Sequence, residues 1–246
     1  IIDLELEKVE LIINKIASDP EDDDVRRVEL ELWKKIKDMA LKGRRTGLGI
    51  TAEGDMLAAL GLRYGSDEAI DFAVTVHKTL AVEAYRASVM MAKDRGAFGV
   101  FDFAKEQGNP MIERICEAAP ELRELMQKYG RRNIAMLTIA PTGTTSLMSQ
   151  TTSGIEPVFR PVYKRRRKIN PSDKDQVASF VDETGEKFIE YYVYHHQFVK
   201  WLEINGYDTT RLQSISEEEL NKWLEASPYY KATANDIDWV AKVKMQ

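Results

Sequence analysis

Residues Ile134–Ala140 form an apolar run, interrupted only by Thr138, that polar and turn-forming residues bound on both sides. Such a short run predicts a β-strand buried on both faces, which is typical of a parallel sheet. The turn-forming residues Pro141–Ser146 follow at once, and a weakly helical stretch over residues 147–151 comes next. A strand, a glycine-bearing turn and a helix start together indicate one βα unit, so the pattern favours the α/β fold class.

The turn contains the candidate site residues Pro141, Thr142, Gly143, Thr144, Thr145 and Ser146. A turn of small residues that enters a helix presents backbone N–H groups without intrahelical partners, and the helix dipole adds positive potential there. Gly143 permits close backbone approach, and the hydroxyls beside it add donors. We therefore expect a phosphate site, although not a P-loop, because no Gly-Lys-Ser/Thr follows. The alternative is an ordinary helix cap, since Ser and Thr favour that position.

Most other segments of the chain have the pattern of helices. Apolar residues recur at helical spacing, and the breaks fall at proline and glycine positions. We predict helices over residues 1–18, 21–43, 52–60, 66–95, 109–130 with an interruption at Pro120, 185–204, 216–226 and 235–243. Residues 164–246, which are rich in tyrosine and tryptophan, are predicted to form a helical subdomain or insertion.

Charge and hydropathy narrow the functions that we expect. The formal net charge of -5 gives no reason to expect nucleic-acid binding. The basic run Lys164–Lys168 is interpreted as a solvated face, because acidic residues follow closely. No apolar run approaches the roughly 20 residues that a membrane-spanning helix needs, so we expect no membrane segment.

The single cysteine and the three histidines bear on metal and redox chemistry. Cys116 alone can form no internal disulfide, and its amphipathic helical surroundings predict a small buried hydrophobic residue. His77, His195 and His196 are poorly spaced for zinc, and the two adjacent histidines are interpreted as packing or surface residues. We expect no metal site, and a reducing, cytoplasmic setting is the default.

Three segments resemble a known family in the same order along the chain. The sequence RN-x-x-x-x-T-x-APTGTTS, which begins at Arg132, is followed by TSGIEP, and together they resemble the large catalytic subunit of ribonucleotide reductases. Residues 44–66 and 83–101 resemble two upstream segments of that family. The glycine of the turn resembles the adenosylcobalamin-dependent, class II branch. The resemblance covers roughly residues 1–163.

The resemblance implies a ten-stranded α/β barrel, of which residues 1–163 would form a part and residues 164–246 would be a helical insertion. It also implies that the turn, with Thr142–Thr145 at its centre, binds the phosphates of a ribonucleotide substrate. The resemblance implies that the intact enzyme converts a ribonucleotide, expected to be the diphosphate, to its deoxy form by radical chemistry with adenosylcobalamin. A homodimer is one assembly that the resemblance allows for the intact enzyme.

The cysteine count departs from the family pattern. The family's chemistry needs a thiyl-forming cysteine and a redox pair, whereas this chain has Cys116 alone. We therefore assign no catalytic residue here, and expect those cysteines in N- and C-terminal parts of a longer polypeptide and no activity from the chain by itself. Two alternatives stay open: a non-catalytic nucleotide-binding or regulatory barrel fragment, and a class I large subunit that needs a radical-generating partner.

Overall fold

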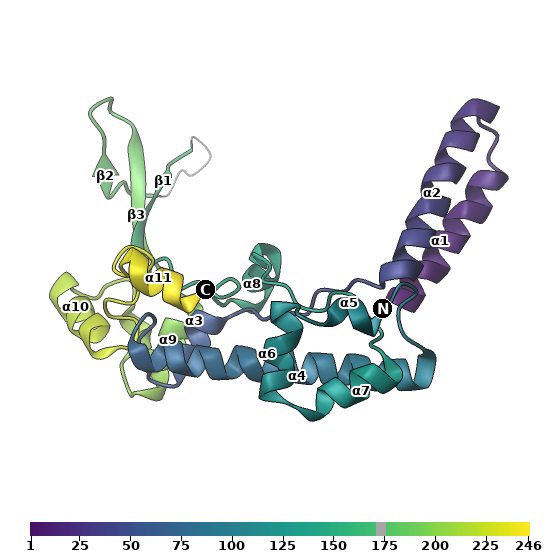
Figure 1. The fold of residues 1–246 in the computed structure, drawn as a ribbon. Helices are drawn as coiled ribbons and strands as arrows, with labels where there is room; N and C mark the ends of the chain where they lie inside the picture. Colours follow the sequence, from purple (N-terminus) through teal and green to yellow (C-terminus); the bar gives the residue numbers. More distant parts are fainter. Residues whose placement is uncertain (171–175) are drawn as a thin grey trace. The chain divides into compact units, whose positions relative to one another are not determined.

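The computed structural model describes residues 1–170 and 176–246 and is helix-rich with one small sheet (Figure 1). The chain divides into two compact units, of which the first comprises residues 1–49 and 75–138 and the second residues 50–74 and 139–246. None of the helices in the described ranges is long and apolar enough to cross a membrane.

The first unit is helical. It contains α1 (Ile2–Ala17), α2 (Asp23–Gly43), most of α4 (Asp67–Arg95), α5 (Phe103–Glu106), α6 (Pro110–Ala118) and α7 (Glu121–Tyr129). These bounds confirm the predicted helices, including the interruption at Pro120. Local capping explains two of the starts: the Asp22 side chain accepts a hydrogen bond from Asp24 N–H, and Asn109 caps α6 with Pro110 at its first position.

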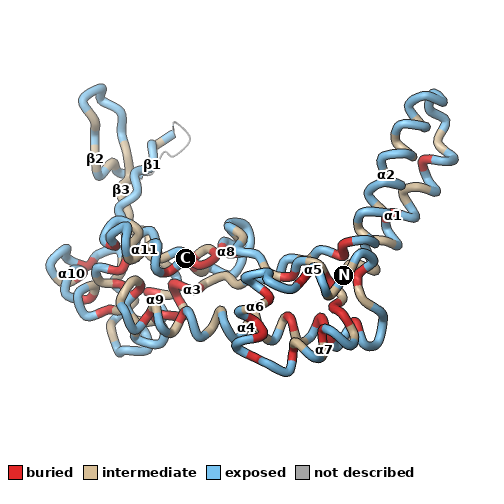
Figure 2. The backbone as a smooth tube through the Cα atoms, in the orientation of Figure 1, coloured by how far each residue is buried: buried red, intermediate tan, exposed pale blue. Residues whose placement is uncertain are grey.

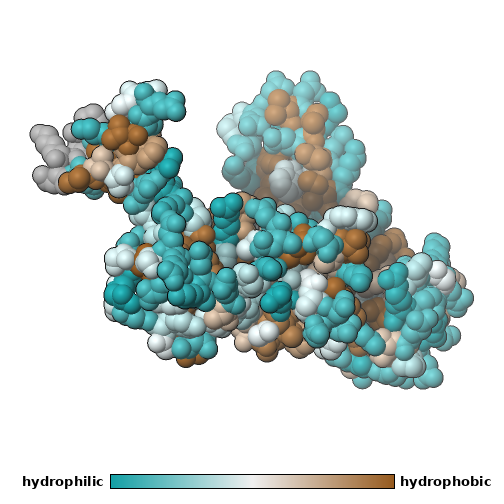
Figure 3. All heavy atoms as spheres, turned by 90° about the vertical axis from the view of Figure 1, so that its left-hand side faces the viewer, coloured by the Kyte–Doolittle hydropathy of each residue, from teal (hydrophilic) through white to brown (hydrophobic). Residues whose placement is uncertain are grey.

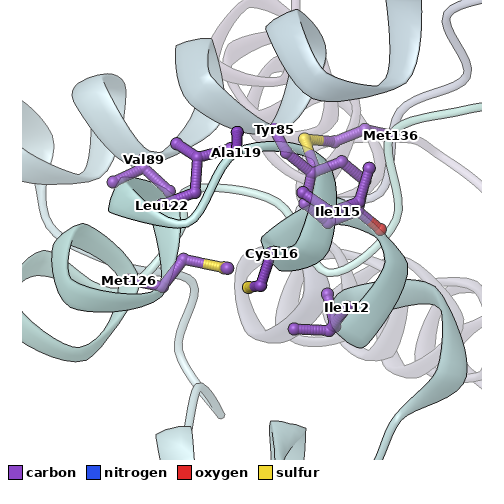
Figure 4. Packing of buried hydrophobic residues seen from close by; sticks show 9 residues of the cluster. All are labelled: Tyr85, Val89, Ile112, Ile115, Cys116, Ala119, Leu122, Met126 and Met136. Atoms are coloured by element: carbon purple, nitrogen blue, oxygen red, sulfur yellow. The ribbon is translucent and has the colours of Figure 1, made fainter. Parts of the chain in front are cut away.

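The core of the first unit lies between α4, α6 and α7, where Figure 2 shows buried positions in red and Figure 4 shows the side chains that meet. Cys116 points into this cluster and is 3% exposed, so the prediction of a small buried hydrophobic residue is confirmed. Burial raises the pKa of the Cys116 thiol. The cluster consists of Tyr85, Val89, Ile112, Ile115, Cys116, Ala119, Leu122, Met126 and Met136.

Where a strand was predicted at residues 134–140, the structure has a single isolated bridge, on one side only. Leu48 N–H donates to Met136 O at 2.6 Å, Thr138 N–H donates to Leu48 O at 3.0 Å, and the one bridge, Leu48 to Leu137, is parallel. The parallel direction agrees with the prediction, but the prediction that both faces are buried was wrong. In the described part of the chain, residues 46–48 are the only segment that pairs with residues 134–140. Without further strands on either side of this pair, Leu48 is 46% exposed and Ile139 is 60% exposed.

The second unit combines short helices with an antiparallel sheet. Its strands β1 (Val162–Lys168), β2 (Phe180–Val181) and β3 (Lys187–Tyr194) lie in the order β1-β3-β2. Apolar side chains (brown) gather on this sheet in Figure 3. Among the side chains of the sheet, the rings of Phe180 and Phe188 lie 6.0 Å apart. The elements are α3 (Glu53–Ala59), the first turns of α4, α8 (Gly143–Ser149), β1 (Val162–Lys168), β2 (Phe180–Val181), β3 (Lys187–Tyr194), α9 (His196–Ile204), the 3-10 helix η1 (Thr209–Arg211), α10 (Glu217–Ala226) and α11 (Trp239–Met245).

The sheet corrects one of the helices predicted in the C-terminal region. Residues 187–194 form β3 where a helix over residues 185–204 was predicted, and only α9 keeps the helical part. The stretch is rich in aromatic and β-branched side chains, which pack well on a pleated surface, and Arg166 pairs with Glu190 across the strands. The predicted division between residues 1–163 and 164–246 falls inside β1 and stays a prediction.

Candidate phosphate-binding site

The predicted turn leads into α8 with exposed backbone N–H groups. Thr142 is the N-cap residue and adopts a left-handed conformation (φ 51°, ψ 26°), and its side chain does not cap the helix. The first intrahelical bond runs from Ser146 N–H to Thr142 O at 2.8 Å. The N–H groups of Gly143, Thr144 and Thr145 therefore precede the bonded part of the helix, as the first donors of a helix do. All three residues are exposed.

Two of the predicted hydroxyls are engaged inside the protein. Thr142 Oγ1 accepts a hydrogen bond from Gly154 N–H at 2.7 Å, and Ser146 Oγ donates to Gly143 O at 2.8 Å. Ser146 Oγ also lies 2.7 Å from Ser153 Oγ, and Ser146 is 5% exposed. Thr142 and Ser146 therefore hold the turn in place, whereas the side chains at positions 144 and 145 lie on the surface.

A cavity of about 430 Å³ adjoins the turn within the second unit. Of the predicted site residues, Pro141 lines it, and Thr142–Ser146 do not. Its wall also includes Glu156. The Glu156 side chain is exposed, and its backbone N–H donates to Ser153 O at 2.9 Å. The other lining residues are Ile139, Ala140, Ser153, Gly154, Ile155 and Gln246.

The loop at residues 151–157 forms the second wall and is fixed by hydrogen bonds from the start of α3 and from the side chain of Tyr64. Glu53 N–H donates to Gly154 O at 3.1 Å, and Tyr64 OH donates to Ile155 O at 2.6 Å. Burial, together with the charges of Glu53 and Glu156, raises the pKa of Tyr64, so this hydroxyl stays a donor. The loop is therefore a rigid support for the turn.

Two glycines allow this close approach. Gly154 has φ +48°, and a Cβ there would lie 2.9 Å from Ala140 O. A Cβ at Gly54 would lie 2.6 Å from Glu156 O, a distance that real side chains do not reach. Glycine is therefore required at both positions because there is no room for a Cβ atom, and not only because of its backbone flexibility.

Asp55 connects this loop to the C-terminal segments. Its Oδ2 accepts a hydrogen bond from Thr152 N–H at 2.7 Å, and its Oδ1 accepts one from Tyr229 OH at 2.9 Å and lies 2.7 Å from His195 Nε2. Asp55 is 7% exposed. No pattern in the sequence indicates this cluster, because His195 and Tyr229 lie 140 and 174 residues after Asp55. His195 was interpreted as a packing or surface residue, and it is a packed one.

The sequence as a whole matches one protein family. The family model for the ribonucleotide reductase barrel domain matches residues 23–246, so the chain belongs to this family. The match extends past residue 163, where the recognisable motifs end.

Individual relatives are reductases with much longer chains. The vitamin B12-dependent ribonucleoside-diphosphate reductase of Mycobacterium tuberculosis is 34% identical over 143 residues, which are 58% of this chain and 18% of the relative. The corresponding enzyme of Thermoplasma acidophilum is 27% identical over 224 residues, covering 91% and 24%. The ribonucleoside-diphosphate reductase subunit alpha of Chlamydia pneumoniae is 32% identical over 146 residues, covering 52% and 14%. The chain thus spans about a fifth of their length.

Proposed function

We propose that the chain is part of the catalytic barrel of a vitamin B12-dependent ribonucleoside-diphosphate reductase, and that its turn at Pro141–Ser146 binds the phosphates of the substrate. The intact enzyme would reduce a ribonucleoside diphosphate to the deoxynucleotide by radical chemistry. This chain would supply the phosphate turn and one parallel strand pair of a ten-stranded barrel. Membership of the barrel-domain family and the likeness to two B12-dependent enzymes support the proposal.

The observation that carries the phosphate assignment is the open start of α8. The N–H groups of Gly143, Thr144 and Thr145 are unbonded within the helix. Apart from its chain neighbours and the backbone of α8, no heavy atom lies within 4 Å of the place where a Cβ of Gly143 would be. An anion can therefore approach the backbone closely, and the positive end of the helix dipole favours it. The exposed hydroxyls of Thr144 and Thr145 supply further donors.

The remaining turn residues have supporting roles in this proposal. Pro141 has no N–H and lines the cavity, which would receive the sugar. Thr142 and Ser146 fix the turn against the loop at residues 151–157 through their hydroxyls. Glu156 lines the cavity, and in this proposal the charge of its side chain would repel a phosphate and so direct the phosphates toward the helix start.

The cofactor in this proposal is adenosylcobalamin, which supplies the radical when it is bound in the intact enzyme. The 430 Å³ cavity beside the turn does not fit the corrin ring and its ligands, so we assign no residue of this chain to the cofactor. Cys116 is enclosed in the core of the first unit, so we assign it no role as a radical-forming cysteine. We expect the chain alone not to reduce nucleotides.

A second candidate is a class I large subunit that receives its radical from a partner. The likeness to the subunit alpha of Chlamydia pneumoniae, at 32% identity, supports it. Activity of the full-length polypeptide with and without added adenosylcobalamin separates the two: dependence on the cofactor supports the first candidate, and activity without it supports the second.

The phosphate assignment is tested by removing one backbone donor. Thr144→Pro deletes one N–H in the first turn of α8, where proline is tolerated. We expect the full-length protein to bind a ribonucleoside diphosphate at least about tenfold more weakly, the scale of one hydrogen bond to a charged group. Glu218→Pro, at the same position of α10, is the matched control and should bind as the wild type does. Equal affinity of the wild type for the diphosphate and the free nucleoside would contradict the assignment.

A further inference from the structure

The carboxylate of Asp55 is buried and is held by donors from three separate segments. Thr152 N–H bonds to Oδ2, whereas His195 Nε2 and Tyr229 OH both meet Oδ1, at 2.7 and 2.9 Å. A buried carboxylate is costly unless donors satisfy it, and here the donors divide between the two oxygens. The position of the carboxylate is therefore fixed from two sides.

Asp55 and Thr152 bond to each other twice. Asp55 N–H donates to Thr152 Oγ1 at 3.2 Å, and Thr152 N–H donates to Asp55 Oδ2 at 2.7 Å. This reciprocal pair fixes both the backbone and the side chain of Thr152. Asp55 lies in the first turn of α3, where a carboxylate ordinarily serves its own helix, but these bonds direct it to the loop instead.

The residues that follow Thr152 hold the phosphate turn. Ser153 Oγ lies 2.7 Å from Ser146 Oγ, and Gly154 N–H donates to Thr142 Oγ1 at 2.7 Å. A displacement of Thr152 is therefore transmitted to both ends of the first turn of α8. The path from Asp55 to the turn consists of hydrogen bonds between buried or half-buried groups.

We propose that Asp55 is a positioning residue for the phosphate turn, and that Tyr229 and His195 set the direction of its carboxylate. The inference rests on the proposed phosphate-binding function and adds to it a connection to the C-terminal segments. Burial and the charge of Asp55 raise the pKa of Tyr229, so its hydroxyl stays a donor. The rings of His195 and Tyr229 meet edge to face at 5.9 Å, so each restrains the other.

The test compares KM with kcat in the full-length reductase. Tyr229→Phe removes one donor to Asp55, and Asp55→Asn removes the charge while keeping the size of the side chain. We expect KM for the ribonucleoside diphosphate to rise about threefold in the first variant and about tenfold in the second, because binding of the phosphates is lost. The matched control is Tyr194→Phe, which removes a hydroxyl whose hydrogen-bond acceptor is Leu212 O, at 2.6 Å, rather than Asp55. Its KM should equal that of the wild type.

A merely structural role would give a different result. Loss of folded protein lowers the apparent kcat but leaves KM unchanged, because the remaining molecules bind normally. Unchanged KM in both Tyr229→Phe and Asp55→Asn would therefore overturn the inference. If Asp55→Asn does not fold, the KM of Tyr229→Phe, which keeps the carboxylate, still tests the inference.

Hydrogen exchange separates this inference from the proposed function. The amides of Thr152 and Gly154 should exchange faster in Asp55→Asn than in the wild type and stay unchanged in Tyr194→Phe, whether or not nucleotide binds. A wild type that binds no diphosphate would overturn the proposed function, whereas unchanged exchange at these amides in Asp55→Asn would overturn the positioning role.

Discussion

The Gly154 N–H group donates a hydrogen bond to Thr142 Oγ1 at 2.7 Å, so the side chain of the N-cap residue of α8 binds the neighbouring loop rather than its own helix. Thr142 Oγ1 also lies 2.8 Å from Thr51 Oγ1. Three chain segments thus meet at one hydroxyl. This explains how a residue in a left-handed conformation can be kept at the start of the helix, since the contacts compensate the backbone strain.

Thr142→Val tests this hydroxyl. Valine has the same branched shape as threonine, so the backbone strain is unchanged and only the hydrogen bonds are lost. We expect the free energy of unfolding to fall by about 1–2 kcal/mol, because Gly154 N–H loses its closest acceptor in a buried position. Urea unfolding measures the change. The same substitution at the exposed Thr145 should alter the unfolding free energy by less than about 0.5 kcal/mol. Equal effects at both positions would argue against a structural role for the Thr142 hydroxyl.

Gly154→Ala tests the close approach of the loop to the turn. The added methyl group would lie 2.9 Å from Ala140 O, in addition to the strain of φ +48°. Gly206 has φ +79° with open space around it, so Gly206→Ala reports the strain alone, about 1–2 kcal/mol. We expect Gly154→Ala to lower the thermal midpoint clearly more than Gly206→Ala does. Similar shifts for both variants would mean that the loop can move away without cost.

Local patterns predicted much of the fold. Asn109 and Pro110 mark the start of α6, and Cys116 is buried as its place in an apolar helix face indicated. The parallel direction of the strand before the turn also followed from its apolar run and the helix start after it. These features depend on residues within a few positions of each other, which is the range over which helix caps and periodicity act.

Long-range contacts explain what the sequence could not predict. Asp55 looked like any polar residue of a short helix, and nothing near it in the sequence indicates that Tyr229 will bond to its carboxylate. In β3, the aromatic residues between Lys187 and Tyr194 were compatible with a helix until pairing with β1 decided the strand. The burial of Ile139 was overestimated because an apolar run does not reveal how many strands lie beside it.

Arg131 offers a stability test in the first unit. Its guanidinium donates to Glu106 Oε1 at 2.5 Å and to Ile134 O at 2.7 Å, so it holds the start of the parallel strand. The Arg131 and Glu106 side chains are 3% and 11% exposed. Arg131→Met should lower the unfolding free energy by about 3–5 kcal/mol, because it leaves a buried carboxylate without its partner. Urea unfolding at neutral pH measures this loss.

The control for that prediction is a more exposed pair. Arg123 and Glu113 form an ion pair whose side chains are 43% and 34% exposed, and Arg123→Met should cost no more than about 1 kcal/mol. A small loss in both variants would show that water reaches Glu106 once Arg131 is gone, and the buried pair would then not hold the strand.

Asp3 lies among three arginines. A hydrogen bond from Arg44 is the largest cause that holds the pKa of Asp3 below its ordinary value, and the charges of Arg132 and Arg95 act in the same direction. A carboxyl group with a lowered pKa in the folded state stabilises the fold above its unfolded pKa and loses that contribution as the pH falls through the folded pKa. Asp3→Asn should therefore be less stable than the wild type at pH 7, and the difference should shrink as the pH falls below about 4. Thermal unfolding of both proteins across this range checks the sign, and a difference that stays constant down to pH 2 would show that packing of α1, rather than the charge of Asp3, is responsible.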